Sequence, residues 1–442
     1  MLNRVRRAAG LDFHVLTTLV LRTWQILAGA AMVLVIPYWL SKVEQGYYFT
    51  FSSLIALNIF FELGLNFVVT QLAGHEVAHL TRSKDGTLMG EARHLDRLAS
   101  LIRLLRRWYP IAAGLFFLGV GVAGLVFFSR SGNLPLRTWA GPWLLLVLAA
   151  AATLYFSPLL AVTEGLGDVG QVARLRSVQS LVGYSLMWVV LALGGGLWSL
   201  SILPMVSVAG TAYWLRSHNE ALAGLERRVA APDAERISWR AEILPLQWRI
   251  ALSWASGYFI FQLFTPMIFA FHGAVEAGRV GLAFAVFNSI QSLGMSWVYA
   301  KGPAFAALIA SKDRATLNRT FLGASARSFA FVLVASLGVL ATAGFLGSIG
   351  SPIADRLAGL PVLACLAAVA VANSLVFAAA TYMRAHKEEP MLAPSVVGGI
   401  LTGGVVFLAS PHGVLLTVFL YMLLTLLVGI PWTAILLRRY YR

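Results

Sequence analysis

The sequence predicts an all-α polytopic membrane protein with about twelve transmembrane helices in two six-helix lobes. The first observation is composition: 59% of the 442 residues are hydrophobic, only 12% are charged, and the mean hydropathy is +0.77. A soluble domain is about a quarter charged, so this composition excludes a water-soluble enzyme as well as a disordered chain. The second observation is length, because a spanning helix needs about 20 apolar residues. With short loops the chain holds about twelve such helices.

Apolar runs recur along the whole chain and give the expected spans. The run after Met1–Arg7 is too long for a signal-peptide core and is followed by no small-residue cleavage site, so we expect an uncleaved first span. The expected helices cover 14–38, 47–72, 109–129, 142–163, 174–194, 197–216, 248–271, 278–300, 321–346, 358–383, 391–410 and 414–437.

The distribution of basic residues predicts that both termini are cytoplasmic. With the N-terminus inside, 27 of the 34 Lys and Arg residues fall on inside segments. Two more, Arg22 and Arg327, lie within spans, and the outside loops carry the remaining five: Lys42, Arg130, Arg137, Arg279 and Arg356. This asymmetry follows the positive-inside rule. It explains the net charge of +15 by orientation and contact with anionic lipid, so no nucleic-acid partner is expected.

The loops are short outside and longer inside. Membrane enzymes that polymerise or ligate sugars usually carry catalytic groups on a large external loop, and the longest outside loop here, near 130–141, has no room for them. The larger inside segments are 73–108 and 217–247. In the first, apolar residues at helical spacing alternate with arginines, which predicts an amphipathic helix in the headgroup plane. The apolar residues are Leu95, Leu98, Leu101, Ile102 and Leu105.

A weak internal repeat supports two lobes. Pro37 ends an apolar helix that is followed by a turn ending at Gly46, and Pro266 lies in a similar helix followed by a turn ending at Gly278. The prolines are 229 residues apart and the glycines 232. We therefore predict an N-terminal lobe at 1–216, a cytoplasmic linker at 217–247 and a C-terminal lobe at 248–442. Parallel repeats of this kind are typical of transporters that alternate access around a central cavity.

Arg22 is the sharpest candidate site residue. It lies about 10 Å into the first span, at 1.5 Å per residue, where a guanidinium costs several kcal/mol unless it faces water or a partner. Gln25 follows on the same helical face. We predict that both bind substrate. The alternative is that Arg22 snorkels to the inner headgroups or pairs structurally.

The second expected helix carries a polar stripe of Asn58, Glu62 and Asn66, which recur every four residues. Glu62 is the only carboxylate well inside a span, at a depth similar to that of Arg22. A pair between these two would be either a switch or mutual neutralisation.

Milder polar stripes occur on other spans. Arg249 and Gln262 on the seventh helix and Asn288 on the eighth complete the predicted substrate-binding set. Arg174, Arg176 and Gln179 open the fifth. Interhelical hydrogen bonding is the alternative for all of them.

Two sequence motifs suggest other chemistry. The segment Gly165–Gly170 fits the dinucleotide fingerprint, but no soluble βαβ unit surrounds it, so we interpret it as a tight turn between spans. His75, Glu76 and His79 fit the zinc-protease pattern, which leaves an intramembrane zinc metalloprotease as an alternative. A zinc site needs a third protein ligand, and no span offers one near the inner side. The single cysteine, Cys365, is expected near the outer side. We expect no catalytic residues, no bound metal and no cofactor.

The segment Leu40-Ser41-Lys42-Val43-Glu44-Gln45-Gly46-Tyr47-Tyr48-Phe49 resembles the bacterial polysaccharide and O-antigen (Wzx-type) flippases. These form part of the multidrug/oligosaccharidyl-lipid/polysaccharide (MOP) exporter superfamily. The resemblance continues through Glu62-Leu63-Gly64-Leu65 to Gln71-Leu72-Ala73-Gly74-His75-Glu76 and covers about residues 15–80.

This resemblance implies a V-shaped pair of lobes around a cationic cavity in the bacterial cytoplasmic (inner) membrane. The implied substrate is an undecaprenyl-pyrophosphate-linked oligosaccharide, moved to the periplasmic leaflet for surface polysaccharide (O-antigen or exopolysaccharide) biosynthesis, with Arg22 in the cavity. Membrane lipid and the polysaccharide polymerase machinery are the implied partners. The coupling ion, proton or sodium, stays open. A multidrug exporter of the same fold is the main alternative, because such exporters use buried carboxylates such as Glu62.

Overall fold

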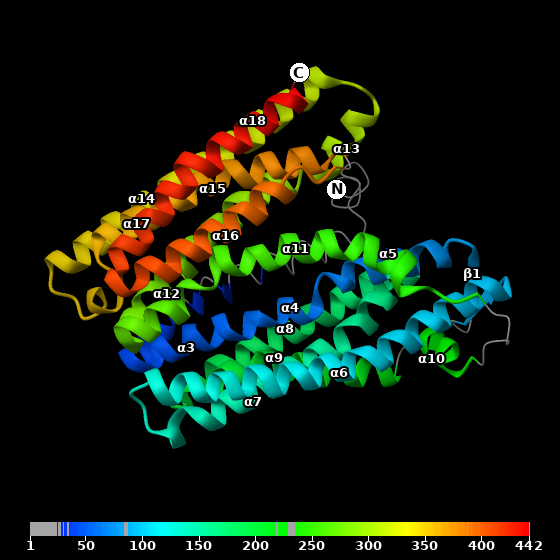
Figure 1. Cartoon of the computed structure of the whole chain (residues 1–442), viewed down its shortest axis with the longest axis horizontal. Helices are drawn as coiled ribbons and strands as arrows, with labels where there is room; N and C mark the ends of the chain where they lie inside the picture. The colour runs from blue at the N-terminus through cyan, green and yellow to red at the C-terminus, as the bar shows by residue number, and fades with distance from the viewer. Residues whose placement is uncertain are drawn as a thin grey trace, which may run out of the picture. The chain divides into compact units, whose positions relative to one another are not determined.

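The computed structural model describes residues 24, 28–29, 31–32, 35–83, 87–217, 220–228, 235–386 and 388–441. This part of the chain is almost entirely helical (Figure 1). It also contains one two-stranded hairpin, which lies between α5 and α6. Helices are expected, because within hydrocarbon each backbone N–H and C=O must find its partner inside the protein. The polytopic helical fold class is thereby confirmed.

The elements follow one another in a regular order. The first part of the chain contains α3 (Lys42–Ile55), η1 (Ala56–Asn58), α4 (Ile59–Glu62), α5 (Leu65–Val77), β1 (Leu80–Arg82), β2 (Leu88–Gly90), α6 (Ala92–Ser131), α7 (Leu136–Thr163), η2 (Glu164–Asp168), α8 (Val169–Ala192), η3 (Gly196–Trp198), α9 (Ser199–Ser217) and α10 (Glu220–Arg227). The rest contains η4 (Trp239–Ile243), α11 (Leu244–Phe261), α12 (Phe264–Tyr299), α13 (Gly302–Ala310), α14 (Arg314–Ser348), η5 (Ala354–Arg356), α15 (Leu360–Arg384), α16 (Leu392–Ala409), η6 (Ser410–His412), α17 (Val414–Leu424), η7 (Thr425–Gly429) and α18 (Ile430–Tyr441).

Within the described ranges, eight helical stretches are long and apolar enough to cross a membrane, or nine if the bent pair α3–α5 is one span. Two of them, Leu136–Ala192 and Gln247–Ala310, are 57 and 64 residues long. A crossing takes about 20 residues, so each must turn back. The turns lie at Gly167 (φ 96°) and Gly273 (φ 81°). Each long stretch therefore contains two expected spans. The number of crossings and the side of each terminus stay predictions.

The expected helix at 47–72 is not continuous. Leu63 (φ 49°) and Gly64 (φ 67°) adopt left-handed backbone conformations, and the chain bends by 42° between α4 and α5. A side chain at Gly64 would also collide with α11, because its Cβ would lie 2.3 Å from Cγ2 of Ile250. A left-handed leucine costs roughly 1–2 kcal/mol, so the surrounding packing holds this break in place.

The described chain forms two compact units, each considered by itself. One consists chiefly of Ile55–Phe128 and Pro135–Ala255, and the other chiefly of Gly29–Leu54 and Ser256–Arg442. In the first unit, α9 packs on both α7 and α8, and α5 packs on α7. In the second, α12, α14 and α15 pack on one another, and α17 packs on α15. The division into two six-helix lobes stays a prediction.

The expected amphipathic helix is the start of the 40-residue helix α6, which continues through Pro110 into the span. The five apolar residues of its stripe are at most 8% exposed and are buried in the first unit. The expectation that this stripe lies in the lipid headgroup plane is therefore wrong. The sequence pattern located the apolar face correctly, but that face packs against protein.

In the second unit, α3 crosses α12 at two glycines. A Cβ on Gly46 would lie 1.9 Å from the carbonyl oxygen of Ala274, and a Cβ on Gly278 would lie 2.8 Å from the Gly46 nitrogen. Nε2 of Gln45 donates to the Gly278 carbonyl at 2.9 Å. The two glycines at equivalent positions of the internal repeat are thus in contact, and neither position has space for a side chain.

We expect Gly46→Ala to lower the stability of the purified protein by about 1–3 kcal/mol, since the backbone of Ala274 cannot yield to the new methyl group. The matched control is Gly257→Ala in α11, where a Cβ meets nothing within 4 Å. Thermal melting in detergent measures both variants. Equal melting temperatures for the two would contradict the glycine crossing.

Candidate functional site

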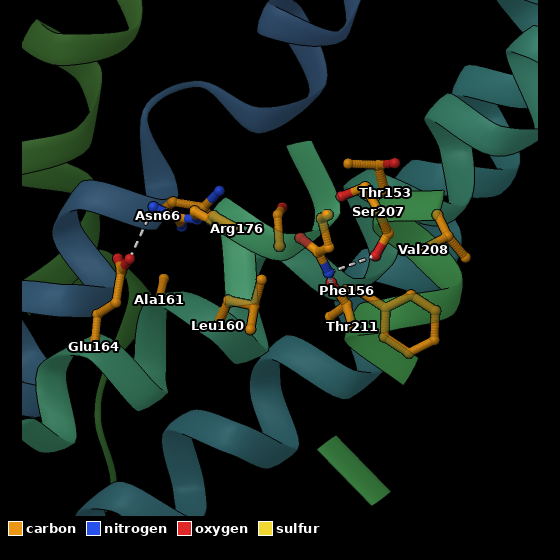
Figure 2. A pocket seen from close by; sticks show the side chains of 12 residues that line it. Asn66, Thr153, Phe156, Leu160, Ala161, Glu164, Arg176, Ser207, Val208 and Thr211 are labelled. Carbon is orange, nitrogen blue, oxygen red and sulfur yellow. Dashed lines mark hydrogen bonds and ion pairs between the residues drawn. The ribbon is translucent and has the colours of Figure 1, made fainter. Parts of the chain in front are cut away.

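A polar cavity of about 170 Å³ lies inside the first unit, among α5, α7, α8 and α9 (Figure 2). Its lining combines amides, hydroxyls and one ion pair with a few apolar side chains. The residues are Asn66, Thr153, Phe156, Ser157, Leu160, Ala161, Glu164, Arg176, Gln179, Ser207, Val208 and Thr211. Because these helices are candidate membrane spans, the cavity is a polar site in an apolar bundle.

The charges of this cavity cancel. Nη1 of Arg176 lies 2.9 Å from Oε1 of Glu164. Figure 2 shows this pair at one end of the cavity, while Thr153, Ser207 and Thr211 lie at the other end. A neutral ion pair presents donors and acceptors without attracting a net cation or anion.

The side-chain amides of the cavity use some of their hydrogen-bonding groups within the protein. Nε2 of Gln179 donates to the Ser207 carbonyl and to Oγ1 of Thr211, both at 3.0 Å. Nδ2 of Asn66 donates to Oε1 of Glu62 at 2.8 Å. Oδ1 of Asn66 is buried and has no hydrogen-bond partner among the described residues. An unpaired buried acceptor costs about 1–3 kcal/mol, so this oxygen is suited to receive a donor from a water or a ligand.

The hydroxyls of α7 also have free acceptor capacity. Oγ1 of Thr153 donates to the Ala149 carbonyl at 2.9 Å, and Oγ of Ser157 donates to the Leu154 carbonyl at 3.1 Å. Each hydroxyl oxygen keeps lone pairs for a further donor. The cavity can therefore hydrogen-bond a ligand that is rich in hydroxyl or amide groups.

The structure brings some of the predicted site residues together. Asn66 lines the cavity with Glu62 bonded to it, and Asn58 lies half-buried one helical turn before Glu62. Arg249 is exposed, with its guanidinium carbon 5.4 Å from the ring centre of Trp248.

The other predicted site residues lie elsewhere. Gln262 is half-buried and Asn288 is exposed in the second unit. Arg22 and Gln25 lie outside the described residues, so their roles stay predictions.

Sequence reasoning missed several residues of the cavity. Glu164 was overlooked because it ends a helix at a turn, and Arg176 and Gln179 were placed only among the milder stripes. A signal was present in the hydroxyls at i, i+4 spacing on two expected helices, Thr153 with Ser157 and Ser207 with Thr211. That spacing puts both members of each pair on one helical face.

The zinc-protease pattern has a structural role. Oε2 of Glu76 lies 2.7 Å from Nδ1 of His94, and Oε1 of Glu76 accepts a hydrogen bond from Nε of Arg97 at 2.8 Å. The ring of His79 stacks on that of His94, with centroids 4.4 Å apart. The described part of the chain contains no cluster of three or more His, Cys, Asp or Glu residues able to hold a metal. Glu76 is thus committed to its hydrogen bonds, and the protease alternative is not supported.

The dinucleotide-like segment forms the expected tight turn, between α7 and α8. Both Asp168 oxygens accept hydrogen bonds from Arg82, at 2.7 and 2.8 Å. The same carboxylate raises the pKa of Arg82 above its usual range. This bidentate pair ties the hairpin to the turn.

Carboxylates of the expected linker pair with arginines of α6, and we call this set of contacts the linker clamp. Arg97 binds Glu242 and Glu235 in addition to Glu76, and Arg93 binds Glu235 at 2.6 Å. Arg93 holds the pKa of Glu235 below its usual range. The contacts of Glu235 are therefore intact at neutral pH and are lost only when acid protonates this carboxyl, whereas Arg97 still binds Glu76 and Glu242.

Arg97→Gln should cost about 3 kcal/mol or more of folding stability, because Arg97 is only 12% exposed and its loss leaves Glu76 without its cation. Arg107→Gln on the same helix is the control, since Arg107 is exposed and makes no ion pair with a described residue. Thermal unfolding of the two purified variants gives the comparison. An Arg97→Gln protein as stable as Arg107→Gln would rule out the clamp.

No family model and no curated protein matches this sequence. Solved structures do match its fold over nearly the full length. The lipid II flippase MurJ in an inward closed conformation has a TM-score of 0.66 at 10% identity, covering 96% of this chain and 87% of its own. The multidrug transporter DinF-BH of the MATE family has a TM-score of 0.60 at 14% identity, covering 96% and 94%.

A multidrug resistance MATE transporter of the MOP superfamily, in an inward-facing conformation, has a TM-score of 0.58 at 15% identity, covering 93% of this chain and 98% of its own. By their names, two of these structures are multidrug transporters and one is a lipid II flippase. The chain therefore shares the fold of these solved structures.

Proposed function

We propose that this protein flips an undecaprenyl-pyrophosphate-linked oligosaccharide across the bacterial cytoplasmic membrane for surface polysaccharide biosynthesis. The observation that carries the proposal is the polar cavity of the first unit. It offers amides and hydroxyls inside an apolar bundle, and its one arginine and one carboxylate neutralise each other. That lining suits the hydroxyl groups of a sugar.

The physical problem of such a transporter is desolvation. Each sugar hydroxyl that enters hydrocarbon without a hydrogen bond costs several kcal/mol, and the pyrophosphate charge costs far more. The cavity would replace water around the sugar through Asn66, Thr153 and Gln179. Arg22 would pair with the pyrophosphate through its guanidinium, as the resemblance implies. Alternating access of two lobes then moves the headgroup without covalent chemistry.

The fold also supports a second candidate, a multidrug exporter, because two of the matched structures are multidrug transporters. Glu62 is the observation in its favour, as a half-buried carboxylate at the break between α4 and α5. A cationic drug needs an available negative charge. Glu62 does not line the described cavity, and the carboxylate that does, Glu164, pairs with Arg176, so the cavity itself favours a hydroxyl-rich ligand over a cation.

A matched pair of isosteric variants tests the cavity. Thr153 and Thr320 each donate to a carbonyl of their own helix, at 2.9 and 2.7 Å, but only Thr153 lines the cavity. We expect Thr153→Val to slow flipping about 2- to 12-fold, the value of one hydrogen bond of roughly 0.5–1.5 kcal/mol. Thr320→Val should leave the rate unchanged.

The assay uses proteoliposomes that contain a fluorescent polyprenyl-pyrophosphate-linked saccharide and a membrane-impermeant reagent that detects the outer leaflet. Equal rates for Thr153→Val and Thr320→Val would show that the cavity does not bind the substrate.

In the host, Arg22→Ala should abolish export while the protein stays in the membrane. Normal export by that variant would refute the role of Arg22.

A further inference from the structure

A second cavity, of about 390 Å³, lies in the first unit among α6, α7, α9 and α10. We call it the inner pocket. Its wall is apolar and includes Phe156, Leu159, Leu215 and Leu222. Phe156 also lines the polar cavity, so a single aromatic side chain contributes to both. The proposed function does not use the inner pocket.

Of the charged side chains that line the inner pocket, two form an ion pair and one arginine has no ionic partner among the described residues. Nε of Arg106 donates to Oε1 of Glu226 at 2.9 Å, which neutralises that arginine. Arg216, near the end of α9, also lines the pocket and makes no ion pair with any described residue. The pocket therefore combines an apolar wall with an available guanidinium.

Aromatic residues indicate the depth of this pocket. Trp108 is 48% exposed and lies within one turn of Arg106 on α6, and Tyr213 is 70% exposed and lies one turn before Arg216 on α9. Trp and Tyr concentrate at the boundary between hydrocarbon and headgroups. The arginines of the pocket are therefore at headgroup level, on the side predicted to be cytoplasmic.

Helix α10 forms part of the wall of the pocket. Its apolar face, with Ala221, Leu222 and Leu225 buried, packs inward, and Glu226 reaches Arg106. The helix leaves Ala223 lining the pocket. A small side chain at this position keeps the cavity open.

We propose that the inner pocket binds the phosphate group of an inner-leaflet lipid, with Arg216 on the phosphate and one hydrocarbon chain along the wall. Guanidinium groups form strong charge-assisted hydrogen bonds with phosphate oxygens. An apolar wall next to the cation adds affinity for a lipid over a free anion, because it buries part of the hydrocarbon chain. The phosphate belongs to a bulk anionic phospholipid or to a polyprenyl phosphate, and the experiment separates these sources.

The test measures ligand binding to the full chain in detergent by native mass spectrometry. The probes are dioctanoyl phosphatidylglycerol, dioctanoyl phosphatidylcholine, undecaprenyl phosphate and inorganic phosphate. We expect phosphatidylglycerol to bind at least tenfold more tightly than phosphatidylcholine or inorganic phosphate. If undecaprenyl phosphate displaces it at lower concentration, the source is the polyprenyl lipid. If not, the source is phospholipid.

Three variants complete the test. Arg216→Gln and Ala223→Phe should each weaken binding at least tenfold, the first by removing the charge and the second by filling the pocket without changing charge. Arg227→Gln on α10 is the control, since Arg227 is exposed, lies outside the pocket and makes no ion pair with a described residue. Melting temperatures verify that all three variants are folded.

Phosphatidylcholine bound as tightly as phosphatidylglycerol would overturn the proposal. So would inorganic phosphate bound as tightly as the lipid, or an Arg216→Gln or Ala223→Phe protein that binds like Arg227→Gln.

Discussion

Backbone groups of a chain in hydrocarbon must find their hydrogen bonds inside the protein, and this constraint shapes the whole structure. Long helices satisfy it, and a helix can be broken only where protein or a water-filled cavity supplies other partners. The chain breaks at Leu63–Gly64 and again at Gly167. Asn66 follows the first break and Glu164 precedes the second, and both line the polar cavity. The cavity thus lies next to two breaks in the helices.

The charged residues of α6 are held in place by ion pairs. The arginines of α6 contribute to the predicted positive-inside asymmetry, and several of them pair with carboxylates. Arg97 alone connects α5, through Glu76, with the segment that contains Glu235 and Glu242. This clamp fixes the expected linker on α6. Arg216 differs, because it lines the inner pocket and makes no ion pair with a described residue.

Hydropathy predicted most helices, because the length and hydrophobicity of a span are local properties of the sequence. The turn at Gly165–Gly170 was also predicted, from the absence of a soluble βαβ unit around it. The break at Leu63 could not be predicted, since leucine rarely adopts a left-handed conformation and its cause is packing against α11. The linker clamp was missed because Arg97 and Glu242 lie 145 residues apart. Of the predicted site, Asn66 lines the cavity and Glu62 is hydrogen-bonded to Asn66, while the roles of Arg22 and Gln25 stay predictions.

The measurement that tests the central claim most directly is mass spectrometry of lipid extracts after deletion of the gene in its host. The account predicts that polyprenyl-pyrophosphate-linked oligosaccharide accumulates, that the matching surface polysaccharide disappears, and that the mass of the lipid identifies the sugar unit. Unchanged lipid-linked sugars and normal polysaccharide, in a strain with no second flippase, together with new sensitivity to cationic drugs, would contradict it and establish the exporter instead.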